Sequence, residues 1–357
     1  MSKITKQDVV DWANKYLGPE SYAIIYKREG KDPDEQKIAA PKITPIVTNR
    51  DSQSEFLSEI QTSQVQPIEP VFVDYKKDMS QFEAQPGIDV LYKKNETNDI
   101  FTLIYVFNTG TENDPALNLA FNYLSYLGTD KMTAEEIASE MYDIACSFYM
   151  NAGANQSSIQ ITGLSENMGK AMEIVEGLIA GAKPDEAILE NCKADMLKSR
   201  ADAKLNQSRC FGALQRYLFY GGDFIRRTTL TDPALQALTS EQLLAKIGGL
   251  MGKQHEVLYY GPQKETEIKS ALAEHHKVAA DLQPLEKKFS TLLPTDANKV
   301  VLAQYDAKQL YYLQFSNRGE KFDVAADPEI TLYNEYFGGG MNTIVFQEMR
   351  EARGLAY

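Results

Sequence analysis

Side chains of the types that bind metals are scarce in this sequence. Its only histidines are His255, His275 and His276. Neighbouring residues of a helix point about 100° apart, so the adjacent pair is poorly placed to share one metal ion, and His255 comes just before an expected strand. Their spacing is also unlike that of typical zinc ligands. We therefore predict a surface or strand-end role for all three, in preference to zinc ligation.

The cysteines give no sign of redox or nucleophilic chemistry. Cys146, Cys192 and Cys210 are odd in number and widely spaced, and each lies in an apolar or helical context. This pattern disfavours a disulfide framework and contains no Cys-x-x-Cys metal pair. We expect them to be small, buried, structural side chains.

Three consecutive glycines, Gly338, Gly339 and Gly340, raise the question of a phosphate loop, because N–H groups at a helix start can bind anions. No Lys-Ser/Thr pair follows them, which argues against nucleotide binding. The preferred interpretation is a tight turn between helices, in which Gly338 ends one helix in the left-handed region and Asn342 caps the next. Contact between the glycine backbone and a substrate strand is the alternative.

Internal repeats indicate how the chain is organised. Residues 4–26 align without a gap on residues 238–260, and both copies predict a helix entered at a Thr, closed by Gly and followed by a short apolar strand. A second pattern also occurs twice. An expected strand, at 100–107 in one copy and at 309–315 in the other, is followed by a polar loop and a helix that begins at Asp-Pro. The predicted units are a tail at 1–30, a linker at 31–80, a complete domain at 81–285 and the first part of a further domain at 286–357.

The complete unit predicts an α+β fold. Thr133 and Glu136 form a capping-box pattern, and 147–154 and 158–162 are expected to be paired strands. Helices are expected at four further places: 166–180, 184–205, 208–220 and 240–251. Grouped helices and hairpin strands are typical of two layers, with helices on one face of a largely antiparallel sheet. The Pro-rich segment before this unit is expected to be an extended connector.

Composition excludes several function classes. The net charge of −13 would repel a nucleic-acid backbone, and no Lys/Arg-rich run occurs. No apolar stretch is long enough to span a membrane, and the first residues lack a signal-peptide pattern. The acidic charge and the style of the linker suggest a bacterial periplasmic protein.

The closing segment carries the most specific pattern. A triple-Gly turn at 338–340 leads to a helix that ends in Arg-Glu-Ala-Arg-Gly-Leu-Ala-Tyr at 350–357. This stretch resembles the signature of the second and fourth domains of the insulinase/pitrilysin family of zinc peptidases. The repeats extend the resemblance to most of the chain except the linker. The resemblance implies that the whole protein consists of several similar α+β domains. These domains would form two halves that close around a chamber.

The resemblance also implies which part of such a peptidase this chain is similar to. The family's zinc helix carries His-x-x-Glu-His, in which two His bind the metal and the Glu acts as general base. At the corresponding place the chain has Leu119-Ala120-Phe121-Asn122-Tyr123. Apolar groups stand where both His ligands would be, and Asn122 replaces the base. The complete unit therefore looks like the family's degenerate third domain, with no metal or cofactor of its own.

Arg350 and Tyr357 are the expected substrate-contacting residues. By themselves they would be a helix-end charge and a half-buried strand residue. In the family's fourth domain a pair with this separation reaches the peptide bond that lies on the zinc, where a guanidinium and a phenol can donate to the developing oxyanion. No catalytic residue is expected in this chain.

The predicted function is the substrate-positioning, non-catalytic half of a zinc endopeptidase that cleaves peptides or unfolded segments. The chain alone is expected to be inactive, with zinc held by a catalytic half of the same protein or by a partner subunit. The alternatives are a structural or assembly scaffold of the same fold and an inactive partner of a separate catalytic chain. A homodimer through the incomplete last unit, which would cover its apolar faces, is a further expectation.

Overall fold

The computed structural model describes residues 4–18, 20, 22–30, 39, 41–42, 52–285, 290–316 and 323–355. The chain divides into two units, Met1–Pro70 and Val71–Tyr357, and each is described by itself. No helix in the described ranges is both long and apolar enough to cross a membrane.

The first unit contains two helices, α1 (Lys6–Tyr16) and α2 (Glu55–Thr62), and neither buries a residue. The cap of α1 confirms the helical half of the first repeat, because Thr5 forms a capping box with Asp8 just as Thr239 does with Gln242. The strand expected at 24–26 was a wrong prediction, since residues 22–28 are in no strand. Helix α2 was not anticipated, and it lies within the segment expected to be an extended linker.

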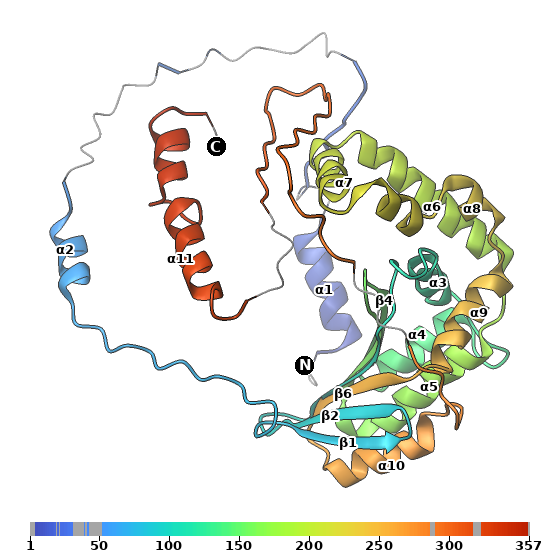
Figure 1. Ribbon diagram of the computed structural model, residues 1–357. Helices are drawn as coiled ribbons and strands as arrows, with labels where there is room; N and C mark the ends of the chain where they lie inside the picture. The colour runs from blue at the N-terminus through green and yellow to red at the C-terminus, as the bar shows by residue number, and fades with distance from the viewer. Residues whose placement is uncertain are drawn as a thin grey trace. The chain divides into compact units, whose positions relative to one another are not determined.

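The second unit is built on one sheet of six strands. In chain order they are β1 (Ser80–Gln85), β2 (Ile88–Lys94), β3 (Ile100–Phe107), β4 (Cys146–Ala152), β5 (Ser157–Leu164) and β6 (His255–Gly261). Their order across the sheet is β1-β2-β6-β3-β5-β4 (Figure 1). Only the β2–β6 pair is parallel; the others are antiparallel. Strand β6 is the last strand in sequence, but it lies in the middle of the sheet, between β2 and β3.

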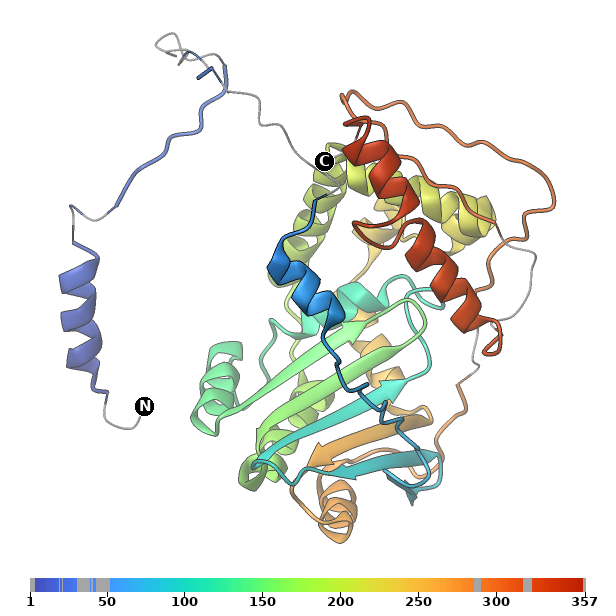
Figure 2. The same ribbon diagram turned by 90° about the vertical axis from the view of Figure 1, so that its left-hand side faces the viewer.

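Helices cover one face of this sheet, and α6 and α7 extend beyond it (Figures 1 and 2). Their bounds are α3 (Leu117–Leu124), α4 (Ala134–Asp143), η1 (Ser165–Asn167), α5 (Met168–Gly181), α6 (Glu186–Lys204), α7 (Gln207–Thr228), α8 (Asp232–Ala237), α9 (Ser240–Met251) and α10 (Glu265–His275). The capping box of Thr133 and Glu136 at α4 and the β4–β5 pair are as predicted. The two-layer α+β fold expected from the sequence is confirmed for this unit.

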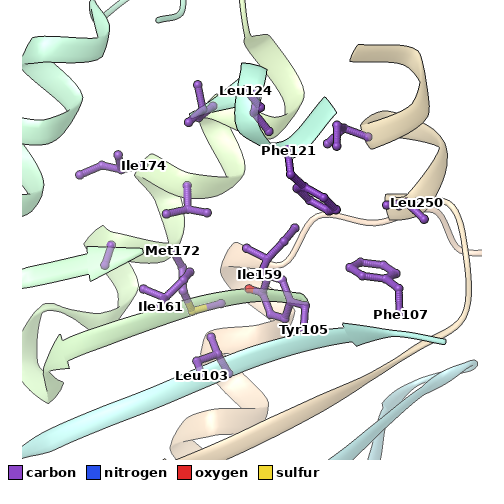
Figure 3. Close-up of a cluster of buried hydrophobic side chains, with 14 of the residues drawn as sticks. Leu103, Tyr105, Phe107, Phe121, Leu124, Ile159, Ile161, Met172, Ile174 and Leu250 are labelled. Atoms are coloured by element: carbon purple, nitrogen blue, oxygen red, sulfur yellow. The ribbon is translucent and has the colours of Figure 1, made fainter. Parts of the chain in front are cut away.

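Alternation along the strands forms the core. On β3, the side chains of Phe101, Leu103, Tyr105 and Phe107 are all buried, while their neighbours are only partly covered. Figure 3 shows several of them against Phe121 of α3 and Met172 of α5. Each such side chain contributes roughly 1.5–3 kcal/mol when fully buried. Successive strand residues point to opposite faces, so Thr102, Ile104 and Val106 of β3 lie on the other face, where they are half-buried.

In the rest of the second unit an expected helix forms and an expected strand does not. Helix α11 (Asp327–Phe337) forms where Asp-Pro predicted it. The strand expected at 309–315 does not form, and this was a wrong prediction. The segment instead lies along α7, where the Tyr311 ring lies 5.5 Å from that of Phe211 and the Phe315 ring lies 4.6 Å from that of Phe219. A strand requires a hydrogen-bonded neighbour, and here side-chain packing on a helix takes its place.

The close approach of β4 and β5 yields a stability prediction. A Cβ added to Gly163 would lie 2.4 Å from the Cys146 sulfur and 2.5 Å from the Ala145 carbonyl oxygen. Because the backbone of β4 must then move, we expect Gly163→Ala to lower the free energy of unfolding by about 2 kcal/mol, measured by urea denaturation. Gly177→Ala is the matched control, since nothing lies within 4 Å of its added Cβ in α5. It should leave stability unchanged or raise it by up to about 1 kcal/mol. Equal effects of the two would contradict this explanation.

Candidate functional site

Helix α3 occupies the place where a zinc helix was expected from the resemblance. Leu119 and Tyr123, at the two positions of the histidine ligands, are 1% and 0% exposed. The Tyr123 hydroxyl accepts the N–H of Asp185 at 2.7 Å and lies 2.8 Å from the Ser240 hydroxyl. Asp185 is the N-cap of α6, and Ser240 is the first residue of α9. The second ligand position therefore holds a structural side chain that ties α3 to the starts of two other helices.

A groove opens between the exposed side of α3 and strand β4. Its volume is about 310 Å³, and none of its lining residues is charged. Asn118, Asn122 and Ser125 come from α3, and Tyr149 and Asn151 from β4. Asn122, at the position of the general base, offers only an amide, which cannot take up a proton at neutral pH. The groove can thus form hydrogen bonds with a ligand, and its lining residues include no carboxylate or imidazole that could act as the general base.

Strand β4 is also the last strand of the sheet on that side. An edge strand presents N–H and C=O groups that can pair with a further strand. Along β4 the side chains alternate, with Phe148 and Met150 packed against the core and Ser147 and Tyr149 exposed. The groove therefore combines a sheet edge with a wall of uncharged polar groups, which suits an extended peptide.

The described part of the chain contains no group of three or more His, Cys, Asp or Glu that could hold a metal ion. The histidines are placed differently from the prediction. His255 is indeed the first residue of β6, but it is only 3% exposed, and His276 is 5% exposed at the end of α10. The strand-end role is therefore correct for His255, which is buried because β6 is a central strand. A surface role is wrong for His276, because α10 packs against α5 and β1. The cysteine sulfurs are free, and burial raises the pKa of the Cys146 and Cys192 thiols, which keeps them protonated and poorly nucleophilic.

The triple-Gly turn forms, with details that correct the prediction. Gly338 ends α11 with φ −144°, so it is not left-handed. Thr343, and not Asn342, accepts the N–H of Phe346 at the start of the next helical segment, at 3.4 Å. The left-handed glycine is Gly354, with φ 59°, which donates its N–H to the Arg350 carbonyl at 3.0 Å after that segment ends. The sequence feature that could have predicted a left-handed Gly354 is its position just after a helical segment rich in Glu and Arg.

Arg350 lies in η2 (Phe346–Glu351), and its side chain is 42% exposed. Its guanidinium lies over the Phe346 ring, 4.7 Å from the ring centre. Its Nε lies 4.0 Å from a carboxylate oxygen of Glu351. Tyr357 lies outside the described residues, so the geometry of the expected pair stays a prediction.

Comparison with known proteins gives relatives but no family assignment by a family model. No family model matches the sequence. An uncharacterized zinc protease of Streptomyces coelicolor is 22% identical over 262 residues, which cover 68% of this chain and 55% of that protein. The chain thus spans about half the length of this curated relative.

Two solved structures are similar in fold. A peptidase M16 inactive domain from Pseudomonas fluorescens has a TM-score of 0.59 and 16% identity, over 78% of this chain and 69% of that one. The periplasmic protease PqqL from Escherichia coli has a TM-score of 0.50 and 12% identity, over 82% of this chain and 30% of that one. The buried ligand positions of α3 agree with the inactive character of the first. The chain is therefore of the insulinase/pitrilysin (M16) peptidase type in fold, and it is similar to the non-catalytic part of that family.

Proposed function

We propose that this chain is the substrate-positioning, non-catalytic part of a zinc-dependent endopeptidase that acts on peptides or unfolded segments. The groove between α3 and β4 is the observation that supports this function most directly. The described residues do not supply a set of zinc ligands. The metal is therefore assigned to a catalytic half of the same protein or to a partner subunit.

The chemistry of the groove defines the kind of ligand it suits. A peptide added along β4 would bind through its main chain, which is largely independent of sequence. The uncharged walls from Asn118, Asn122 and Ser125 would add hydrogen bonds without selecting for charge. Such recognition suits segments that are already unfolded, because only they can present an extended main chain.

Arg350 and Tyr357 are proposed to contact the peptide bond that is cleaved. A guanidinium and a phenol both donate hydrogen bonds that strengthen as a carbonyl becomes an oxyanion. The partial exposure of Arg350 leaves its donors accessible to a ligand. These two residues would therefore contact the peptide at the bond that the catalytic half cleaves.

The groove can be tested by filling it. We expect Asn122→Trp to weaken binding of a fluorescein-labelled, uncharged, extended peptide at least about tenfold, measured by fluorescence anisotropy with the whole chain. Asn122 is exposed on α3, so the larger side chain should leave the fold intact. Ala245→Trp, at an exposed position of α9, is the control and should bind as the unaltered chain does. Absence of binding to the unaltered chain, or equal binding by Asn122→Trp, would contradict peptide positioning by this groove.

A structural or assembly scaffold is the second candidate function. It is favoured by the surface of α11, where Leu332 is 72% and Tyr336 is 68% exposed. Apolar faces of this kind mark contacts with other proteins. A homodimer or a contact with a catalytic partner would both cover them, and sedimentation of the chain alone distinguishes the two.

A further inference from the structure

A buried chain of hydrogen bonds joins the sheet to two helices in the second unit. The Lys253 carbonyl lies 2.8 Å from Nδ1 of His255, and Nε2 of His255 lies 2.8 Å from Nε2 of His276. Nδ1 of His276 in turn lies 2.5 Å from Oε1 of Glu176. These groups come from β6, the end of α10, and α5. The side chains of His276 and Glu176 are 2% and 11% exposed.

The number of protons in this chain follows from its geometry. A carbonyl oxygen only accepts, so Nδ1 of His255 carries a proton, and in a neutral ring Nε2 of His255 is then an acceptor. Nε2 of His276 must therefore carry the proton that lies between the two rings. One proton remains for the last link. It resides either on Nδ1 of His276, giving an imidazolium beside a carboxylate, or on Glu176, giving two neutral groups.

A second proton on His255 has no place in this arrangement. If Nε2 of His255 were protonated, two N–H groups would face each other across 2.8 Å. Glu176, the ionisable carboxyl in contact with the pair, is already hydrogen-bonded to His276. Tyr105 of β3, whose ring lies 4.2 Å from that of His276, is held neutral because burial and the Glu176 charge raise the pKa of its hydroxyl. The Phe107 ring, 4.7 Å from that of His255, is apolar, and Lys253 contributes only its carbonyl.

We propose that His255, His276 and Glu176 form an acid-sensitive latch, in which one shared proton holds α10 against the sheet and a second proton, on His255, releases it. Two elements depend on this contact. Helix α10 packs on α5 and β1, and the segment after His276 returns to β6, where Gln254 donates its N–H to the Gln283 carbonyl at 2.9 Å. Release would therefore loosen the chain from α10 to about residue 285 while the rest of the sheet stays paired.

The direction of the pH effect follows from His255. Burial lowers its pKa from 6.5 to about 4. Because the folded-state pKa is below the unfolded value, the stabilisation is complete above pH 6.5 and is lost as the pH falls toward about 4. The latch is thus closed at neutral pH and opens in mild acid.

Hydrogen exchange on the whole chain tests the latch. Amide protection of α10, corrected for the intrinsic pH dependence of exchange and compared with α3 in the same molecule, should fall about tenfold or more between pH 7.5 and 5. His255→Gln keeps an acceptor for His276 but cannot be protonated, and it should remove this fall. His275→Gln is the matched control, because His275 is next in sequence to His276 but outside the hydrogen-bonded chain, and it should behave as the unaltered protein does.

A second measurement does not depend on any variant. Imidazole ¹⁵N NMR at neutral pH should show His255 neutral with its proton on Nδ1, and His276 with a proton on Nε2. Two outcomes would overturn the proposal: α10 protection that does not change between pH 7.5 and 4.5, or the same acid-dependent loss in His255→Gln as in the unaltered chain. An NMR spectrum with His255 protonated on Nε2 at neutral pH would also contradict the arrangement.

Discussion

Under the proposed function, replacing Arg350 by Ala in the protein assembled with a catalytic half is expected to lower kcat/KM about 10²–10³-fold, the usual loss for one oxyanion donor. The guanidinium would donate to the scissile carbonyl mainly in the transition state, so kcat should fall more than KM rises. Tyr357→Phe is expected to cause a loss of the same order. Steady-state kinetics on a fluorogenic peptide measures both.

Arg353→Ala is the matched control for Arg350. It is another arginine of the same segment, 66% exposed, with Glu348 at 3.6 Å. Its removal should change kcat/KM less than about twofold, and neither arginine variant should change stability by more than about 1 kcal/mol. Normal turnover in Arg350→Ala and Tyr357→Phe would remove the role of the pair. Absence of any peptide cleavage by the assembled protein would contradict the peptidase function itself and leave the scaffold.

Truncation of Tyr123 should have the largest effect on stability. We expect Tyr123→Ala to lower the free energy of unfolding by about 4 kcal/mol, because it leaves a cavity beneath α3 and removes the tie to α6 and α9. Tyr123→Phe retains the ring but leaves the Asp185 N–H without its acceptor, at a cost of about 1–3 kcal/mol. Urea denaturation measures both. Tyr142→Ala, at an 83% exposed tyrosine of α4, is the control and should cost less than about 0.5 kcal/mol.

This prediction separates a structural role from a vestigial one. If Tyr123 only filled the position of a lost ligand, Tyr123→Phe would be neutral, and the hydrogen bonds to Asp185 and Ser240 would contribute nothing measurable. If they contribute as expected, restoring histidine there would remove the tie as well as add a ligand. The absence of a histidine at this position of α3 is then tied to the packing of the unit.

Local signals in the sequence were sufficient for much of the fold. The capping boxes at Thr133 and Thr239 each involve residues three apart, and the helices they begin were predicted correctly because those contacts are complete within one turn. The β4–β5 pair was also predicted, since its strands are adjacent in sequence and alternate in polarity. The segments 24–26 and 309–315 were predicted as strands from the internal repeats, and they are not strands. A strand depends on a neighbour that its own residues do not specify.

The sequence by itself determined the α+β class, the absence of a His-x-x-Glu-His motif and the resemblance carried by residues 338–357. Only the tertiary structure decided the contacts on which the candidate sites depend. Tyr123 meets Ser240 across 117 residues, and Glu176 meets His276 across 100. The sequence placed His255 at a strand end but did not predict that His255 and His276 are buried, because polarity predicts exposure only on average. Their burial depends on β6 entering the middle of the sheet, which is a property of strand order and is not encoded in any local pattern.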